Sequence, residues 1–374
     1  MLEHVREKKK NRPRVGVFTR PIDKGTSGSG HHLHEILRHV LELNKEFEII
    51  LIHYEKNDTD IYRSAPEIII PRNPLRAAAV LKSFDFDVLH YNPLTIFAPM
   101  LGLKAAKCAT IHGAEPNIVP RYYNLTTRLH ARAVKPFLAR RMDRIFTVSR
   151  TSKDYYVRNW GVRPERVSIC YNSVSNAYRR LGTETEIRKK YAISGRHIFH
   201  VSKYSPRKNP ECILRGFAEL AADSDFSDLS LVLSGSGWEN DYTRSLVGEL
   251  GLKKRVVCTG FTPEEDVVAL FNEAEAFVFP SRAEGFGMPN IEAMACGCPV
   301  VTSSSFAIPE IVGDAAQLME DADDYHDLAQ KVRALLKNPS LRDDYVQKGL
   351  ARAACYSWTT SAETVLSGYR DLIR

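Results

Sequence analysis

Short apolar runs that alternate with helical patterns constrain the fold of this 374-residue chain more than any other feature. A first series of strand-like runs lies at residues 14–19, 47–53, 88–91, 109–112, 144–148 and 167–170. A second series lies at 197–201, 229–233, 256–259, 276–279 and 299–302, with helical patterns between the runs, for example at 32–43, 212–222 and 242–251. Continuous apolar strands separated by helices are typical of parallel sheets covered on both faces. We therefore expect an α/β protein with two doubly wound domains, whose ligands bind at the carboxyl ends of the strands.

The boundary between the two domains is expected near residues 171–196, after the last strand of the first series. We assign residues 1–175 to the first domain and 176–355 to the second, and a chain of this length can give each domain its own core. The two halves differ in charge. Residues 1–175 contain 29 Lys and Arg against 17 Asp and Glu, whereas the rest of the chain contains 23 against 28. This asymmetry predicts different partners for the two domains.

Composition excludes several classes of protein. A hydrophobic fraction of 44% and a charged fraction of 26% are typical of a soluble globular protein, and no run of about eighteen apolar residues could span a membrane. The first fourteen residues lack the apolar core of a secretory signal. The seven cysteines are scattered, and the one close pair, Cys296 and Cys298, lacks the spacing of a zinc site. We interpret them as thiols of a protein in the reducing cytoplasm.

The most informative segment follows an apolar strand, and residues 280–301 read P-S-R-A-E-G-F-G-M-P-N-I-E-A-M-A-C-G-C-P-V-V. Gly285 and Gly287 allow the chain to turn tightly at the end of the strand. Pro289 suits the first position of a helix, and Gly297 is expected to end that helix about two turns later. The segment therefore predicts a strand, a tight loop and a short helix.

Two glutamates and a set of amides in this segment suit a ligand rich in oxygen. The amides of Phe286, Gly287 and Met288 are expected at the helix N-terminus, where they favour anionic or oxygen-rich groups. Glu284 lies in the loop and Glu292 in the helix. Because an ionised carboxylate only accepts hydrogen bonds, each suits the hydroxyls of a diol better than a phosphate. The alternative is one capping glutamate and one solvated glutamate.

The string E-G-F-G-M-P-N-I-E-A-M-A-C-G-C-P-V-V resembles the signature of the family 4 retaining glycosyltransferases, whose GT-B fold has two Rossmann-like domains facing an interdomain cleft. The resemblance implies that Glu284 and the following amides hold a donor sugar and that Glu292 holds the nucleotide ribose. Gly235, after the strand at 229–233, is assigned to the same donor site. The C-terminal segment 356–374 resembles the family's terminal helix, which crosses back onto the first, acceptor-side domain.

A second feature opens the second domain with the sequence H-V-S-K-Y-S-P-R-K-N-P from His200. Lys203 and Lys208 could converge on a phosphate as point charges and stabilise a departing nucleoside diphosphate. The loop resembles the family's pair of one arginine and one lysine. Lys203 stands where the family usually has arginine, and Ser202 stands where it usually has glycine. Two solvated lysines beside a turn are the alternative.

A glycine loop follows the first strand, with the sequence K-G-T-S-G-S-G-H-H from Lys24. Its spacing is G-x-x-G-x-G, which differs from the G-x-G-x-x-G dinucleotide fingerprint, so a dehydrogenase is not expected. The loop resembles the family's first-domain glycine loop, which borders the donor phosphates and the acceptor. Gly28, Gly30 and His31 are therefore candidates for the acceptor side of the cleft. A plain turn is the alternative.

His112 ends a strand-like run and is followed by glycine, in the sequence T-I-H-G-A from Thr110. The family carries a histidine here, near the donor sugar, where an imidazole can hydrogen-bond a hydroxyl without acting as a base. We group it with Glu284, Lys208 and Lys203 as the candidate catalytic residues. A satisfied core histidine is the alternative, and that alternative is favoured for His90, on the preceding strand.

A basic stretch at residues 121–144 contains seven Lys and Arg against the single acid Asp143, with aromatic and leucine residues between them. Such a stretch can lie on an anionic membrane surface or bind a phosphate-bearing acceptor, and a helix that simply packs on its domain is the alternative. Nothing in it resembles a nucleic-acid motif, so no nucleic acid is expected.

The resemblance implies a hexosyltransferase that retains anomeric configuration and acts on a glycan, lipid-linked or small-molecule acceptor. The run F-A-I-P-E-I-V-G-D-A-A from Phe306 is similar to mannosyltransferase-like members that use GDP-mannose, with a UDP-sugar as the alternative donor. No D-x-D metal loop is placed for catalysis, so neither a metal nor another cofactor is expected. A nucleotide-sugar 2-epimerase, a pyridoxal-phosphate phosphorylase-like enzyme and a non-catalytic sugar-binding relative remain open. We expect a cytoplasmic protein that could associate peripherally with the inner membrane face.

Overall fold

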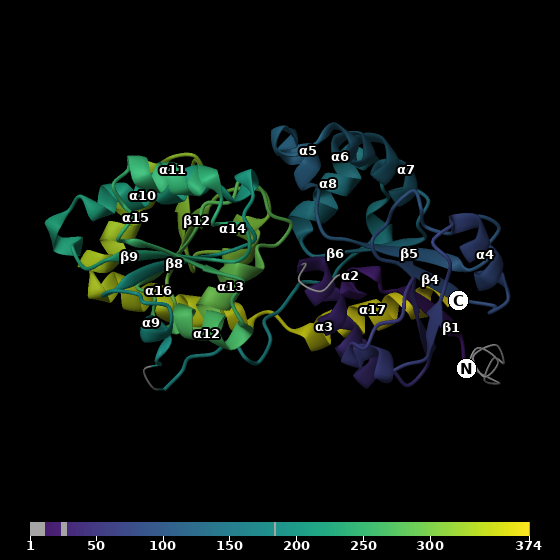
Figure 1. Ribbon diagram of the computed structural model, residues 1–374. Coiled ribbons are helices and arrows are strands. Elements are labelled where there is room, and N and C mark those ends of the chain that lie inside the picture. Colours follow the sequence, from purple (N-terminus) through teal and green to yellow (C-terminus); the bar gives the residue numbers. More distant parts are fainter. Residues whose placement is uncertain (1–11, 24–27, 183–184, 374) are drawn as a thin grey trace. The chain divides into compact units, whose positions relative to one another are not determined.

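The computed structural model describes residues 12–23, 28–182 and 185–373, and the chain forms two compact units (Figure 1). Unit 1 comprises Met1–Asn172 and Ser357–Arg374, and unit 2 comprises Ser173–Tyr356. Within the described ranges, no helix has both the length and the apolar character needed to cross a membrane.

Unit 1 is built on a sheet of seven parallel strands in the order β3-β2-β1-β4-β5-β6-β7. Their bounds are β1 Arg14–Phe18, β2 Glu48–His53, β3 Glu67–Ile69, β4 Val88–Tyr91, β5 Ala106–Ile111, β6 Arg144–Thr147 and β7 Val167–Ile169. The residues of β1 and β4 are all buried, as expected for apolar strands covered on both faces. The sequence predicted each of these strands except β3, a three-residue edge strand.

Helices cover both faces of this sheet (Figure 1). They are α2 Arg20–Asp23, α3 Gly28–Leu43, α4 Pro74–Lys82, α5 Glu115–Ile118, α6 Leu125–Leu129, α7 Lys135–Ala139, α8 Arg150–Trp160 and α17 Trp358–Ile373, with a π-helical turn, η3 His130–Val134, between α6 and α7. The C-terminal helix α17 lies beside α3, and its Val365, Leu366 and Tyr369 join the apolar core that includes Ile36 and Val40. This helix therefore completes the core of unit 1 although it is distant in sequence.

Unit 2 has a sheet of six parallel strands in the order β10-β9-β8-β11-β12-β13. Their bounds are β8 His197–Val201, β9 Ser230–Ser234, β10 Val256–Gly260, β11 Ala276–Phe279, β12 Val300–Ser303 and β13 Gln317–Met319. The surrounding helices are α9 Ile187–Lys190, α10 Pro210–Ala221, α11 Asp241–Glu249, α12 Glu264–Glu273, α13 Met288–Ala295, α14 Ile308–Val312, α15 Tyr325–Lys337 and α16 Pro339–Ala354. The sequence predicted these strands except β13, another three-residue edge strand.

Both sheets reverse their strand order at one point, between β1 and β4 in unit 1 and between β8 and β11 in unit 2. In doubly wound sheets, ligands bind outside the carboxyl ends of the strands at this switch point. The loop after β8 contains Lys203 and Lys208, and the loop after β11 contains Glu284. The topology therefore brings the two most informative sequence features of unit 2 to its switch point.

Candidate active site

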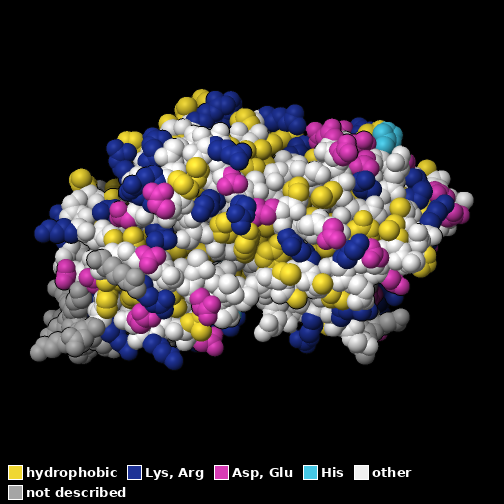
Figure 2. Space-filling view, turned by 180° about the vertical axis from the view of Figure 1, so that it is seen from behind, with side chains coloured by type: hydrophobic (Ala, Val, Ile, Leu, Met, Phe, Trp, Pro, Cys, Tyr) yellow, Lys and Arg dark blue, Asp and Glu magenta, His cyan; other side chains and the backbone are white. Residues whose placement is uncertain are grey.

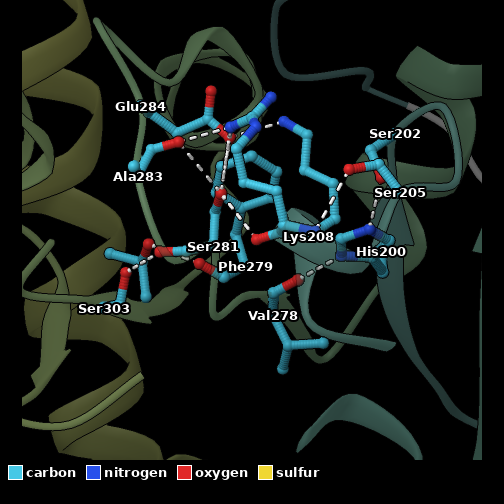
Figure 3. A network of polar contacts seen from close by, with 12 residues as sticks. His200, Ser202, Ser205, Lys208, Val278, Phe279, Ser281, Ala283, Glu284 and Ser303 are labelled. Atoms are coloured by element: carbon cyan, nitrogen blue, oxygen red, sulfur yellow. Dashed lines mark hydrogen bonds and ion pairs between the residues drawn. The ribbon is translucent and has the colours of Figure 1, made fainter. Parts of the chain in front are cut away.

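The carboxylate of Glu284 is the centre of a polar network at the switch point of unit 2 (Figure 3). Its Oε1 accepts hydrogen bonds from Arg207 Nη1, Lys208 Nζ and Ser281 Oγ, each 2.6 Å long. The side chains of Arg207, Lys208 and Glu284 are 18%, 13% and 11% exposed. Three donors on one oxygen fix the carboxylate, and its Oε2 has no hydrogen-bond partner among the described residues.

A short 3-10 helix, η5 Pro206–Lys208, places the two basic side chains of the network. The Oγ of Ser205 accepts a hydrogen bond from the Arg207 amide (3.2 Å) and so caps η5. Asn209 follows with a φ of +62° and caps α10 in turn, with its side chain accepting from Cys212 N. Lys208 Nζ also lies 4.6 Å from the centre of the Phe279 ring. Capping at both ends therefore holds Arg207 and Lys208 toward β11.

The loop after β11 is held by hydrogen bonds of its own (Figure 3). Ser303 Oγ donates to the carbonyl of Ser281 at 2.5 Å, which ties the loop to the end of β12. The Arg282 amide donates to the carbonyl of Arg207 at 3.0 Å, and Arg207 Nη1 donates to the carbonyl of Ala283. These bonds join the loops after β8 and β11 and the end of β12 into one platform.

The electrostatics of this platform keep Glu284 ionised. Burial raises the pKa of the Glu284 carboxyl, but the charges of Arg207 and Lys208, with the hydrogen bonds from Lys208 and Ser281, outweigh burial and lower the pKa to about 2. The network contains two cations and one carboxylate, so it retains a positive charge. It can thus present a hydrogen-bond acceptor to hydroxyls and a positive potential to an anion.

The turn into α13 adopts the geometry that the glycines were expected to allow. Gly287 is the N-cap of α13 with a φ of +88°, which favours glycine, and Pro289 is the second residue of the helix, one position later than predicted. The buried Phe286 ring contacts Tyr356 with ring centres 5.4 Å apart at 75°. Gly297, with a φ of +73°, follows the end of the helix. The backbone at Gly287 and Met288 thus lies at the N-terminus of α13, a helix of eight residues.

Glu292 lies on α13 and differs from Glu284 in its protonation. Burial raises the pKa of the Glu292 carboxyl, and the nearby charge of Glu264 raises it further, while Lys208 lowers it, so that it reaches about 8. Glu292 is therefore mostly protonated at neutral pH in the ligand-free protein. Lys208 thus lowers the pKa of both glutamates.

Lys203 does not join the network around Glu284. Its side chain is exposed, and it has no ion pair or side-chain hydrogen bond within the described part of the chain. The preceding Ser202 hydrogen-bonds through Oγ to His200 Nε2 at 2.8 Å, so the serine that replaces the family's usual glycine has a partner. Gly235, with a φ of +109°, packs against the Ser202 backbone so closely that a Cβ would overlap it. Gly235 therefore shapes the loop that carries Lys203.

Among the candidates in unit 1, His112 presents an unpaired ring atom. Its Nε2 is buried and has no hydrogen-bond partner among the described residues. Burial, together with the nearby His32, Lys135 and His90, holds the pKa of His112 well below its usual range, so the ring is neutral. The ring of His32 meets it edge-on, with centres 4.6 Å apart. A neutral imidazole with a free nitrogen can hydrogen-bond a hydroxyl.

His90 instead has the two partners of a core residue. Its Nδ1 hydrogen-bonds with Tyr369 Oη at 2.7 Å and its Nε2 with Thr110 Oγ1 at 2.8 Å. In the glycine loop, His31 is exposed, Gly28 and Gly30 begin α3, and Lys24 and Gly25 lie outside the described residues.

The basic stretch divides into structural and exposed parts. Arg140 donates to the carbonyl of Trp160 at 2.8 Å, and Arg144 binds Ser168 and Asp371 at 2.9 Å, so these side chains hold the fold. The exposed part combines apolar and basic side chains. It contains Leu125, Leu129 and Phe137, which are 66%, 57% and 47% exposed, and the exposed Arg121, Arg132 and Arg141. Figure 2 shows basic and hydrophobic side chains together, with few acidic ones, over the upper edge of unit 1.

Sequence reasoning missed three polar residues of unit 2. Arg207 and Ser281 contact Glu284 directly, and the adjacency of Arg207 to Lys208 was the available signal. Asn290, on α13, is fully buried, and neither polar atom of its side chain has a partner within the described residues. An amide among the apolar residues of a short helix was the corresponding signal for Asn290.

Comparisons with known proteins agree with this architecture. A family model described as Glycosyltransferase Family 4 matches residues 26–177, and one described as Glycosyl transferases group 1 matches residues 183–352. The O-antigen chain mannosyltransferase B of Escherichia coli is 28% identical over 307 residues, which cover 80% of this chain and 78% of that protein. The MMP alpha-(1->4)-mannosyltransferase of Mycolicibacterium hassiacum is 28% identical over 324 residues, which cover 80% and 74%. The serotype-specific mannosyltransferase WbdA of E. coli is 27% identical, but the match spans only 29% of its length.

Solved structures show the fold. HepE from Anabaena, in complex with UDP and glucose, matches 96% of this chain and 100% of its own with a TM-score of 0.78 at 18% identity. WaaG, a glycosyltransferase involved in lipopolysaccharide biosynthesis, matches 94% and 98% with a TM-score of 0.72 at 17% identity. With the two parallel sheets, these neighbours confirm the GT-B fold that the sequence predicts.

Proposed function

The chain belongs to the family 4 glycosyltransferases, and from that premise we propose that it transfers a hexose from a nucleotide diphosphate sugar to an acceptor hydroxyl with retention of configuration. The observation that carries the proposal is the contact of Glu284 with Arg207, Lys208 and Ser281 at the switch point of unit 2. The network pairs an acceptor for sugar hydroxyls with a positive charge for a diphosphate, and a nucleotide sugar needs both.

Each group then has a role in the transfer. Glu284 Oε2 accepts a hydroxyl hydrogen of the donor sugar, Glu292 receives the ribose diol, and the amides of Gly287 and Met288 face polar oxygens of the donor. Lys208 and Lys203 stabilise the negative charge on the departing diphosphate, and Arg207 shares this role. His112 Nε2 hydrogen-bonds a hydroxyl of the donor sugar or the acceptor.

The transfer needs no covalent intermediate with the enzyme, because one bond breaks at the anomeric carbon as another forms there. The acceptor oxygen forms a bond to the anomeric carbon on the face from which the diphosphate leaves. The bond between that carbon and the diphosphate oxygen breaks, and its electron pair leaves with the nucleoside diphosphate. The acceptor proton passes to an oxygen of the departing diphosphate, which serves as the base. Because protein cations neutralise the leaving group, we propose that the transfer needs no metal ion.

For the donor, we propose GDP-mannose. The mannosyltransferase names of several relatives support mannose, while the UDP and glucose bound to HepE favour a UDP-sugar as the second candidate. A thermal-shift panel of GDP, UDP, ADP and their sugar conjugates tests the choice, since a ligand that binds only the folded state raises the melting temperature. A selective shift with GDP supports mannose transfer, and a selective shift with UDP moves the proposal to glucosyl or N-acetylglucosaminyl transfer. No shift with any nucleotide contradicts the donor site.

For the acceptor, we propose a hydroxyl of a glycan, a lipid-linked sugar or a small molecule, and we propose that a lipid-linked acceptor is reached at an anionic membrane surface. The support is the exposed part of residues 121–141, where Leu125 and Leu129 of α6 and Phe137 of α7 alternate along the chain with the exposed Arg121, Arg132 and Arg141. Apolar side chains can enter the interface while the arginines pair with lipid phosphates.

Vesicle sedimentation tests this membrane contact. The protein should sediment with phosphatidylcholine vesicles only when they contain phosphatidylglycerol, and a Leu125→Asp/Leu129→Asp variant should remain in the supernatant. Leu75→Asp is the matched control, since Leu75 is 63% exposed on α4. Equal binding of the parent, the double variant and Leu75→Asp to the phosphatidylglycerol vesicles would contradict the membrane contact.

A further inference from the structure

Unit 1 contains a cavity of about 290 Å³ that none of the candidate site residues lines. It is bounded by residues that follow the first four strands, namely Arg20, Asp23, Tyr54, Glu55, Arg72 and Phe97. All of these strands are parallel, so their carboxyl ends lie along one edge of the sheet, and β1 and β4 flank its switch point. Small-ligand sites range from about 300 to 1,000 Å³, so this cavity suits a single sugar-sized group.

A smaller recess next to the cavity contains an unsatisfied amide. The recess, about 10 Å³, shares Arg20 and Tyr54 with the cavity and is also lined by Asn92. Asn92 is 1% exposed, and neither its Nδ2 nor its Oδ1 has a hydrogen-bond partner within the described residues. A buried amide without partners destabilises the folded state, and a space of this size holds about one water. A ligand hydroxyl, which both donates and accepts, would satisfy Asn92 there.

Two arginines and two carboxylates line the cavity, and one of the arginines, Arg20, forms no ion pair with a described residue. Asp23 accepts a hydrogen bond of 2.5 Å from Tyr62 Oη, and Glu55 forms an ion pair of 2.8 Å with Arg72. Arg20 is exposed, its guanidinium carbon lies 5.8 Å from the centre of the Tyr54 ring, and it forms no ion pair with any described residue. A guanidinium placed over an aromatic ring is well suited to bind a phosphate through two hydrogen bonds.

The remaining wall of the cavity is aromatic. Phe97 is 61% exposed, and Tyr54 is half-buried beside Arg20. An exposed aromatic face beside polar groups can bury the apolar face of a sugar ring while the hydroxyls reach those groups. The cavity thus combines an aromatic face, an amide for a hydroxyl and a cation for an anionic substituent.

We propose that this cavity binds the acceptor and that the acceptor is a phosphorylated sugar, with Arg20 on the phosphate and Asn92 on a ring hydroxyl. The inference rests on the proposed function, because it assigns the second substrate of the same transfer. A soluble sugar phosphate and the sugar of a phosphate-linked glycolipid share this chemistry.

Binding of two probes to the full chain, measured by calorimetry in the presence of the preferred nucleotide, tests the proposal. α-D-Mannose 1-phosphate should bind at least tenfold more tightly than methyl α-D-mannopyranoside, which lacks the phosphate. Arg20→Ala should abolish this difference in affinity, and Asn92→Ala should lower the affinity for both probes at least fivefold. Arg76→Ala is the control, since Arg76 is an exposed arginine on α4 outside the cavity, and it should bind as the parent protein does.

Equal affinity for the two probes, or an Arg20→Ala variant that still prefers the phosphate, would overturn the assignment. So would an Asn92→Ala variant that melts earlier but binds both probes normally. The octyl phosphodiester of mannose distinguishes a soluble sugar phosphate from a phosphate-linked glycolipid. If it binds more tightly than α-D-mannose 1-phosphate and its binding still depends on Arg20, the acceptor is lipid-linked. The nucleotide thermal shift reports on the donor site and does not depend on the cavity. Normal nucleotide binding with no sugar binding therefore overturns the cavity assignment, and loss of nucleotide binding overturns the donor site.

Discussion

Lys208 and Glu284 form an ion pair of 2.6 Å between Nζ and Oε1, and this pair joins the loops that follow β8 and β11. Because Arg207 contacts the same oxygen, Glu284 neutralises only one of the two cations. The carboxylate therefore fixes the geometry of the loops, while the cluster keeps a positive charge. Removing a cation should affect catalysis more than folding, and removing the carboxylate should affect both.

Replacement of Lys208 by alanine tests the catalytic half of this argument. Arg207 and Ser281 still bind Glu284 in this variant, so the fold should persist. If Lys208 stabilises the leaving diphosphate, its loss should lower kcat by about 10²–10³-fold, as for removal of one charge-stabilising donor. Steady-state transfer assays and thermal melting of the same preparations give the two quantities.

Lys203→Ala is the companion variant. Lys203 has no ion pair within the described residues, so the free energy of unfolding should change by less than about 0.5 kcal/mol, as for a surface substitution. A catalytic role then appears as a loss of kcat without a loss of stability. Unchanged turnover in Lys208→Ala would eliminate that residue as a catalytic group.

Chelation tests the proposal that protein cations replace a metal ion. If Arg207, Lys208 and Lys203 carry the charge of the diphosphate, EDTA should leave the initial rate of transfer unchanged. Added magnesium should also leave it unchanged. A rate that falls after EDTA treatment and returns with one divalent cation would assign that role to a metal.

Glu292 should make stability depend on pH. Burial and Glu264 raise the pKa of its carboxyl from 4.5 to about 8, so the folded state binds the proton more tightly than the unfolded state. The stability that this proton provides is complete below pH 4.5, decreases as the pH rises, and is lost above about pH 8.

The Glu292→Gln variant isolates this contribution, because glutamine does not titrate. Urea unfolding at pH 5, 6.5 and 8.5 should show the parent losing on the order of 3 kcal/mol relative to the variant. Parallel pH profiles of the two proteins would contradict the raised pKa.

The fold was more predictable from the sequence than the contacts within the site. Buried central strands such as β11, with the sequence A-F-V-F, are continuous apolar runs, and each was predicted. The edge strands β3 and β13 were missed because three residues give no readable period, and both acquire strand geometry by pairing with a neighbour.

In the site, the glycine and proline pattern predicted the turn into α13, because backbone geometry is a local property. The partners of Glu284 were not predictable. Arg207 lies 77 residues away, and its approach depends on the 3-10 turn at η5 and on the pairing of β8 with β11. The cavity near Asn92 was missed for the same reason, since its walls come from four separate strand ends.

Tyr369→Phe tests whether α17 is bound to the sheet of unit 1 by a specific polar contact. The variant leaves His90 Nδ1 without its 2.7 Å partner in a buried site. An unpaired buried polar atom costs about 1–3 kcal/mol, and the free energy of unfolding should fall by that amount. Chemical denaturation measures the change. Tyr242→Phe is the control, since Tyr242 is 46% exposed and should lose less than about 0.5 kcal/mol.

Gly235→Ala tests whether the close approach of two strand ends shapes the donor site. Gly235 has a φ of +109°, and a Cβ there would overlap the carbonyl of Ser202. Backbone cannot yield as a flexible side chain can, so the variant should lose at least about 2 kcal/mol of stability and displace the loop that carries Lys203. Gly248→Ala is the matched control. Gly248 lies within α11 with only ordinary contact to Lys253, so alanine there should stabilise the protein by about 0.5–1 kcal/mol. If Gly235→Ala instead melts and binds nucleotide like the parent protein, the approach of β9 to β8 does not position Lys203.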